Sequence, residues 1–158
     1  MSLVLTSGAF HAGEAIPARY TCEGADVSPP LLWSGTPRGT ASFVLILDDP
    51  DAPGGTWVHW VLFNLPGTVT ALPEGVPKAD APRELGGALQ GRNDFRKVGY
   101  GGPCPPPGRP HRYFFRLYAL DAVLPLRAGA DRKAVDAAMR GHVLAETALM
   151  GTYGRGAR

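Results

Sequence analysis

The sequence predicts an antiparallel, mainly β protein, and two observations support this fold class. First, 21 glycines and 16 prolines among 158 residues leave little room for long helices and favour short strands joined by ordered turns. Second, three segments carry the apolar pattern of buried strands. A chain of this length can bury its own core, so we expect residues 1–158 to form a single domain.

The first two strands are expected at Ser42 to Asp49 and at Thr56 to Asn64. In both segments, the residues expected on one face and those expected on the other are mostly apolar, which is typical of strands covered on both faces. In the second segment, strict alternation places His59 on the same face as Val61 and Phe63.

A third strand is expected from His111 to Leu120, with His111 and Tyr113 on its apolar face. One helix should follow, opened by Asp131 as the N-cap. Its apolar side is predicted from residues at i, i+3 and i+4 spacing, namely Val135, Ala138, Met139, His142, Val143 and Glu146. Thr147 to Tyr153 is expected to form a short closing strand, and Pro82 to Tyr100 a long excursion of the kind that often carries function.

Charge and composition exclude several function classes. The 16 basic and 14 acidic residues nearly balance and are mostly scattered, which argues against a nucleic-acid partner. No run of 18 apolar residues predicts a transmembrane segment, and the first residues lack the pattern of a signal peptide, so we expect a cytoplasmic protein.

The sequence also lacks the common signatures of catalysis. It contains no G-x-S-x-G, H-E-x-x-H, Walker, G-x-G-x-x-G or C-x-x-C motif, and we therefore predict no catalytic residue, no cofactor and no enzyme activity. A metal site built from Asp48, Asp49, Asp51 and His59 has suitable ligand types, but two prolines stiffen the loop and no calcium-loop pattern follows. We predict no metal.

Polar residues gather at the expected strand ends. Asp49 and Asp51 follow one strand, His59 lies near the start of the next, and His111 opens the third beside a loop rich in glycine and proline. If these strands are neighbours, the four side chains meet at one rim and form a small-molecule site. Alternatively, Asp51 caps a turn, Asp49 pairs with an arginine such as Arg112, and each histidine is a satisfied core residue.

Two of these segments also carry a family resemblance. "LDDPDAPGGTWVHWVLFNLP" and "GGPCPPPGRPHRYFFRLYAL" resemble the two signature regions of the phosphatidylethanolamine-binding protein family. "YTCEGADVSPPLLWSGTPRGTASF" and "GHVLAETALMGTYGR" are similar to its bacterial branch, which is often labelled Raf-kinase-inhibitor-like. The resemblance implies a large central antiparallel sheet packed on a smaller sheet, with one or two short helices at the periphery.

The resemblance further implies a small anion pocket built from both signatures. Carried over position by position, its ligand-lining residues are Asp49, Pro50, Ala52, Pro53, His59, Gly102, Pro103, His111 and Tyr113, supported from behind by Asp51 and Arg112. The chain ends without the further C-terminal helix of eukaryotic relatives, so a more open pocket is expected.

Such a pocket has a physical rationale. Histidine N–H groups and a loop donor such as the Gly102 amide can hold a phosphate or carboxylate, provided that neighbouring groups fix the imidazole tautomers. The aspartates are expected to do so and to favour the charged imidazolium. An exposed carboxylate could also accept the ammonium of a zwitterionic head group.

The two cysteines raise a separate question. Cys22 and Cys104 lie in loops rich in glycine and proline, and the resemblance implies a disulfide, because extracytoplasmic members of the bacterial branch can have a cysteine in each of these loops. The alternative is two inert thiols, which a cytosolic location would favour.

Three function classes follow. The leading one is a binding module for a small anionic or zwitterionic phosphate ligand, such as a phospholipid head group, with a regulatory role as a variant. The second is an inhibitor of a kinase or protease that acts through exposed loops, as the family label suggests. The third is a hydrolase using His59 and His111 as acid and base. The resemblance also suggests a homodimer, because bacterial relatives are often dimers.

Overall fold

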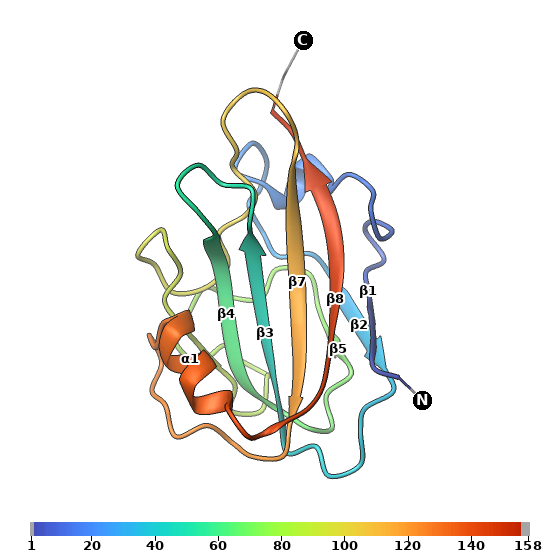
Figure 1. Ribbon diagram of the computed structural model, residues 1–158, viewed down its shortest axis with the longest axis vertical. Coiled ribbons are helices and arrows are strands. Elements are labelled where there is room, and N and C mark those ends of the chain that lie inside the picture. Colours follow the sequence, from blue (N-terminus) through green and yellow to red (C-terminus); the bar gives the residue numbers. More distant parts are fainter. Residues whose placement is uncertain (1, 156–158) are drawn as a thin grey trace.

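A computed structural model of the protein, which describes residues 2–155, contains two antiparallel sheets (Figure 1). The large sheet has the strand order β6-β4-β3-β7-β8 and the small sheet the order β1-β2-β5. The large sheet consists of β3 (Ser42–Asp49), β4 (Trp57–Pro66), β6 (Leu89–Gln90), β7 (His111–Leu120) and β8 (Val143–Tyr153). The small sheet consists of β1 (Val4–Thr6), β2 (Leu31–Ser34) and β5 (Ala71–Leu72). The mainly β prediction is confirmed.

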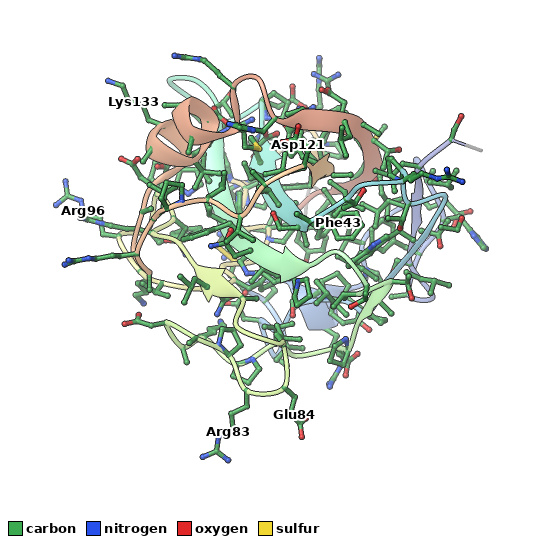
Figure 2. The ribbon with its side chains drawn as sticks, turned by 90° about the horizontal axis from the view of Figure 1, so that it is seen from below. Phe43, Arg83, Glu84, Arg96, Asp121 and Lys133 are labelled. Atoms are coloured by element: carbon green, nitrogen blue, oxygen red, sulfur yellow. A yellow bond between two sulfur atoms is a disulfide. The ribbon has the colours of Figure 1, made fainter. Side chains whose placement is uncertain are left out.

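Two apolar clusters cover the two faces of the large sheet. One fills the space between the sheets and joins Trp33 of β2 to Phe43, Trp60 and Phe115 of the large sheet. Figure 2 shows Phe43 in the interior of the molecule. Because the strands at the centre are covered on both sides, β3 is buried at every position, as its unbroken apolar run predicts.

The second cluster lies on the opposite face, beneath α1 (Arg132–Met139), which contributes Val135 and Met139 (Figure 1). Asp131 caps this helix as predicted, since its Oδ1 accepts from the Ala134 amide at 2.9 Å. The other helical element is a single 3-10 turn, η1 (Ala18–Tyr20). No helix among residues 2–155 is both long enough and apolar enough to cross a membrane.

The predicted helix was too long at its C-terminal end. The helix stops at Met139, and Val143 and Glu146, assigned to its apolar side from their spacing, belong instead to β8. Gly141 has a φ of +81°, a conformation that glycine adopts without strain and that commonly ends a helix. His142 is therefore exposed, and its Nδ1 lies 2.8 Å from Asp121 Oδ1.

The strand order brings the predicted polar residues to one end of the large sheet. β3 pairs with both β4 and β7, so the end of β3 lies beside the starts of the other two strands. The β3–β4 loop and the long connection that leads into β7 meet at this same end, at the top of Figure 1. The topology thus places Asp49, His59 and His111 at a common rim.

Candidate functional site

Asp49, the last residue of β3, organises the rim. It is 3% exposed, and its Oδ1 accepts from the Asp51 amide at 2.8 Å, which shapes the turn after the strand. Its Oδ2 lies 2.7 Å from His111 Nδ1. Since a carboxylate only accepts, His111 carries its proton on Nδ1, and its Nε2 is left for another partner.

Asp51 and Arg112 form the second ion pair of the rim. Arg112 donates to both carboxylate oxygens of Asp51, from Nε at 2.9 Å and from Nη2 at 2.8 Å, and its amide also donates to Oδ2. These hydrogen bonds lower the pKa of Asp51 to about 2. The sequence-based alternative, in which Asp51 caps the turn and Asp49 pairs with Arg112, therefore had the two aspartates reversed.

Asp48 points to the other face of the sheet and does not belong to the rim. Its Oδ2 accepts from Arg116 Nε at 2.8 Å and from Arg132 Nη1 at 2.7 Å, so it fastens α1 to the sheet. The alternation of β3 thus gives the adjacent carboxylates separate tasks.

His59 is the extra residue of a β-bulge. Asp48 pairs with Val58 and Leu47 with Trp60, which leaves His59 without an opposite residue on β3. Strict alternation predicted His59 on the face of Val61 and Phe63, and this was wrong, because those residues pack beneath α1. The bulge turns His59 toward Tyr113 of β7, with ring centroids 5.4 Å apart.

The charge expected on His59 is also corrected. The ring is 3% exposed, and burial is the largest influence on it, so its pKa lies below the usual value in spite of nearby Asp49. Its Nδ1 lies 2.7 Å from the Gly101 carbonyl oxygen and must donate to it. At neutral pH, His59 is therefore an uncharged ring whose Nε2 is an acceptor.

Tyr113 lies under both histidines. Its ring centroid is 5.4 Å from that of His59 and 6.4 Å from that of His111, and the residue has no exposed surface. Burial raises the pKa of its hydroxyl, which stays protonated. The hydroxyl makes no hydrogen bond of ordinary geometry among residues 2–155, although the Asp49 carboxylate lies near enough to raise its pKa further.

A hollow of about 280 Å³, here called the central hollow, opens between the two histidines. Of the predicted ligand-lining residues, it is lined by Asp49, Ala52, Pro53, His59 and His111. It is also lined by residues outside that predicted set: Trp57, Phe95, Cys104, Pro105 and Pro106. Most of the wall is apolar, and the polar groups concentrate at the two rings.

The other predicted residues are not part of this lining. Pro50, Pro103 and Tyr113 do not line the central hollow. The expectation that the Gly102 amide would serve as an anion donor is corrected, because that amide already donates to Asp26 Oδ1 at 2.8 Å. A Cβ at Gly102 would come within 2.2 Å of the Tyr20 carbonyl oxygen, so a glycine is needed there for close packing.

Cys22 and Cys104 form a disulfide that closes a separation of 82 residues. Both cysteines are exposed, and Cys104 lies in the wall of the central hollow. The same two loops are also joined by the Cys22 amide, which donates to the Pro103 carbonyl at 3.1 Å. The covalent bond therefore fixes part of the wall to the N-terminal region.

The carboxylates of this region have little capacity for a metal ion. Asp48 and Asp51 are each bound to arginine, and Asp49 is held by His111 and the Asp51 amide. In the described part of the chain, no three histidine, cysteine, aspartate or glutamate side chains gather as metal ligands. The polar groups that remain for a ligand are the Nε2 atoms of the two histidines.

Comparison with known proteins places the chain in a family. The sequence profile described as phosphatidylethanolamine-binding protein matches residues 6–154, which include β3, β4 and β7. The chain belongs to the phosphatidylethanolamine-binding protein family. A UPF0098 protein from Methanothermobacter thermautotrophicus is 55% identical over 96% of this chain and 99% of its own length. A second UPF0098 protein, from Pyrococcus horikoshii, is 50% identical over 98% of this chain and 78% of its own length.

Two solved structures of the family have the same fold. YbcL from E. coli superposes with a TM-score of 0.92 at 36% identity, covering 99% of this chain and 100% of its own. A phosphatidylethanolamine-binding protein homologue from Chlamydia trachomatis superposes with a TM-score of 0.88 at 42% identity, covering 98% of this chain and 99% of its own. The expected arrangement of a large sheet packed on a smaller one is confirmed.

Proposed function

We propose that this family member is a binding protein that holds a small anion, such as phosphate or a phosphomonoester, between His59 and His111. The observation that carries the proposal is the pair of rings in one hollow, each with Nδ1 engaged, by the Gly101 carbonyl and by Asp49. The ring positions are thus fixed in advance, and both Nε2 atoms are left for a ligand.

A binding role fits the lining better than covalent catalysis does. None of the residues that line the central hollow is a serine or threonine, and its cysteine, Cys104, is held in a disulfide. Hydrolysis with His59 and His111 as acid and base is checked directly by incubating the protein with a phosphomonoester and measuring released phosphate. We expect no turnover that depends on either histidine.

Replacement of either histidine tests the proposed function. We expect His59→Ala and His111→Ala each to weaken phosphate binding by about 10- to 100-fold, the loss of one hydrogen bond to a charged group. Isothermal titration calorimetry with inorganic phosphate measures the effect. The matched control is His142→Ala, because His142 has the same Nδ1-to-aspartate pairing, with Asp121, on an exposed surface. If all four proteins bind phosphate with equal affinity, phosphate does not bind between His59 and His111.

Because His59 is uncharged in the free protein, the binding of sulfate should depend on pH. A sulfate oxygen needs an Nε2–H group, which the neutral ring lacks, so sulfate should bind together with a proton. We therefore expect sulfate affinity to rise as the pH falls from 7.5 to 6, by about three- to tenfold per pH unit. Sulfate is the probe because its own charge is constant over this range.

The same linkage fixes the sign of the stability change. The pKa of His59 is lower in the folded protein than in the unfolded chain, so the unfolded state takes up the proton first and the free protein loses stability as the pH falls below about 6.5. Sulfate should offset this loss. In His59→Gln, whose amide donates a hydrogen bond without taking up a proton, sulfate affinity should depend less on pH than in the wild type, because one fewer ring has to take up a proton when sulfate binds. A slope as steep as that of the wild type contradicts the assignment to His59.

A further inference from the structure

A second hollow adjoins the central one. It has a volume of about 350 Å³, and Phe95 and Cys104 line both hollows. Its other walls include Val98, the ring of Tyr100 and the disulfide partner Cys22. The side chain of Phe95 and the disulfide are thus all that the two linings share.

The loop that carries Phe95 is held in place by hydrogen bonds of its neighbours. The buried Asn93 accepts from the Phe95 amide at 2.9 Å and donates to the Gly99 carbonyl at 2.9 Å, while Asp94 is bound to the Val58 amide of β4. The phenyl ring itself is 37% exposed and makes edge contacts with Trp57 and His59 at centroid distances of 5.5 and 5.3 Å. It can therefore turn while the loop stays in place.

The polar groups of the second hollow do not need a polar ligand. The Tyr100 hydroxyl donates to the Tyr20 carbonyl at 2.6 Å, Asp26 accepts from the Gly102 amide, and the side-chain oxygen and nitrogen of Asn93 are bonded within their own loop. What is left is an apolar wall with two lysines at its border. Lys78 lies 3.6 Å from Asp26, and Lys97 has no ion-pair partner in the part of the chain that is described.

We propose that the second hollow is an extension of the anion pocket, divided from it by Phe95, and that the protein selects phosphomonoesters with an uncharged apolar substituent. The phosphate lies between the histidines, and the substituent passes the phenyl ring into the second hollow. Lys78 and Asp26 balance each other's charge, but Lys97 adds a positive charge to the lining, so a positively charged substituent such as the ammonium of phosphoethanolamine is disfavoured. This inference rests on the proposed function, since it requires an anion between the histidines.

The test is a ligand series measured by calorimetry: inorganic phosphate, then methyl, butyl and hexyl phosphate, and phosphoethanolamine. Each methylene buried in the second hollow improves affinity about fourfold, so hexyl phosphate should bind at least about 30-fold more tightly than methyl phosphate. Phosphoethanolamine should bind more weakly than butyl phosphate. Chemical shifts of the Val98 methyl groups should change with hexyl phosphate and not with methyl phosphate.

Two variants distinguish binding of the alkyl chain in the second hollow from its nonspecific binding elsewhere. Val98→Phe fills the second hollow and should abolish the gain with chain length while methyl phosphate binds as before; Val123→Phe, at a residue that is 63% exposed, is the control for added bulk. Phe95→Ala should raise the hexyl-to-methyl affinity ratio, because no ring has to turn aside. If Phe95 were only a wall that contacts the chain, the ratio would fall.

The outcomes distinguish the two proposals. Binding of phosphate and methyl phosphate without any gain for butyl or hexyl phosphate overturns the extension and leaves the anion site intact. A gain with chain length that survives in Val98→Phe also overturns it. Failure of phosphate and methyl phosphate to bind overturns the proposed function, and the extension with it.

Discussion

Replacement of both Cys22 and Cys104 by alanine is expected to lower the free energy of unfolding by about 4 kcal/mol and the melting temperature by about 10 °C. The disulfide closes a separation of 82 residues, so without it the unfolded chain gains a large amount of conformational freedom. The magnitude is that of the chain-entropy model for a loop of this length.

The native loops should stay close to their positions without the bond. The Cys22 amide donates to Pro103, the Gly102 amide to Asp26, and the Tyr100 hydroxyl to Tyr20, all between the same two regions of chain. We therefore expect the double variant to bind phosphate within about threefold of the wild type, since only the outer part of the wall is released.

Chemical denaturation of the wild type and the double variant, each with and without reductant, measures the change. Reductant should destabilise the wild type and leave the variant unaffected. Mass spectrometry on unreduced protein provides an independent check, and two thiols open to alkylation would contradict the bond itself. The same measurement on protein taken directly from cells also bears on the expected cytoplasmic location, because disulfides are rare in most reducing cytosols.

The bounds of two strands at the rim follow from sequence pattern. The predicted bounds of β3 and β7 agree with the structure, because an unbroken apolar run and a regular alternation each fit only a few backbone conformations. The buried face of β7, with Tyr113 and Phe115, is likewise confirmed. Period and burial are local properties, and the sequence carries them directly.

The sequence did not predict the β-bulge that turns His59 toward Tyr113. An extra residue in a strand leaves no mark in the alternation, and it depends on how β3 and β4 pair. The role of Phe95 is hidden for a different reason: it lies in an excursion that pairs little with the sheets, and its position is set by Asn93 through side-chain hydrogen bonds. The adjoining Asn93 and Asp94 are the residues in that stretch that favour a tight turn, and they were the available signal.

The end of the helix could have been recognised from the sequence. Gly141 immediately precedes the residues that were wrongly assigned to α1, and glycine is the commonest residue just after a helix. Periodicity alone extended the helix, because Val143 and Glu146 happen to continue the spacing. Stop signals therefore outweigh periodicity at the end of a short helix.

Replacement of the two adjacent carboxylates of β3 should affect different properties: Asp48 mainly the stability of the fold and Asp49 mainly the binding of phosphate. We expect Asp48→Asn to lower the free energy of unfolding by about 3 kcal/mol, because it leaves Arg116 and Arg132 without the charge that both contact. This figure is at the lower end for a broken buried pair, since the two arginines are still 31% and 25% exposed and keep part of their hydration. Phosphate affinity should change by less than about threefold, because Asp48 faces away from the rim.

Asp49→Asn is the matched variant, and it should weaken phosphate binding with only a small loss of stability. An amide oxygen can still accept from the Asp51 amide, so the turn after β3 is kept and the stability loss should be about 1 kcal/mol. His111, however, loses the carboxylate that holds its proton on Nδ1 and fixes the orientation of its ring, so phosphate binding should weaken by about tenfold or more. Denaturation and calorimetry on both proteins measure the two quantities. A large binding defect in Asp48→Asn, or an intact affinity in Asp49→Asn, would show that the two faces of β3 do not divide these tasks.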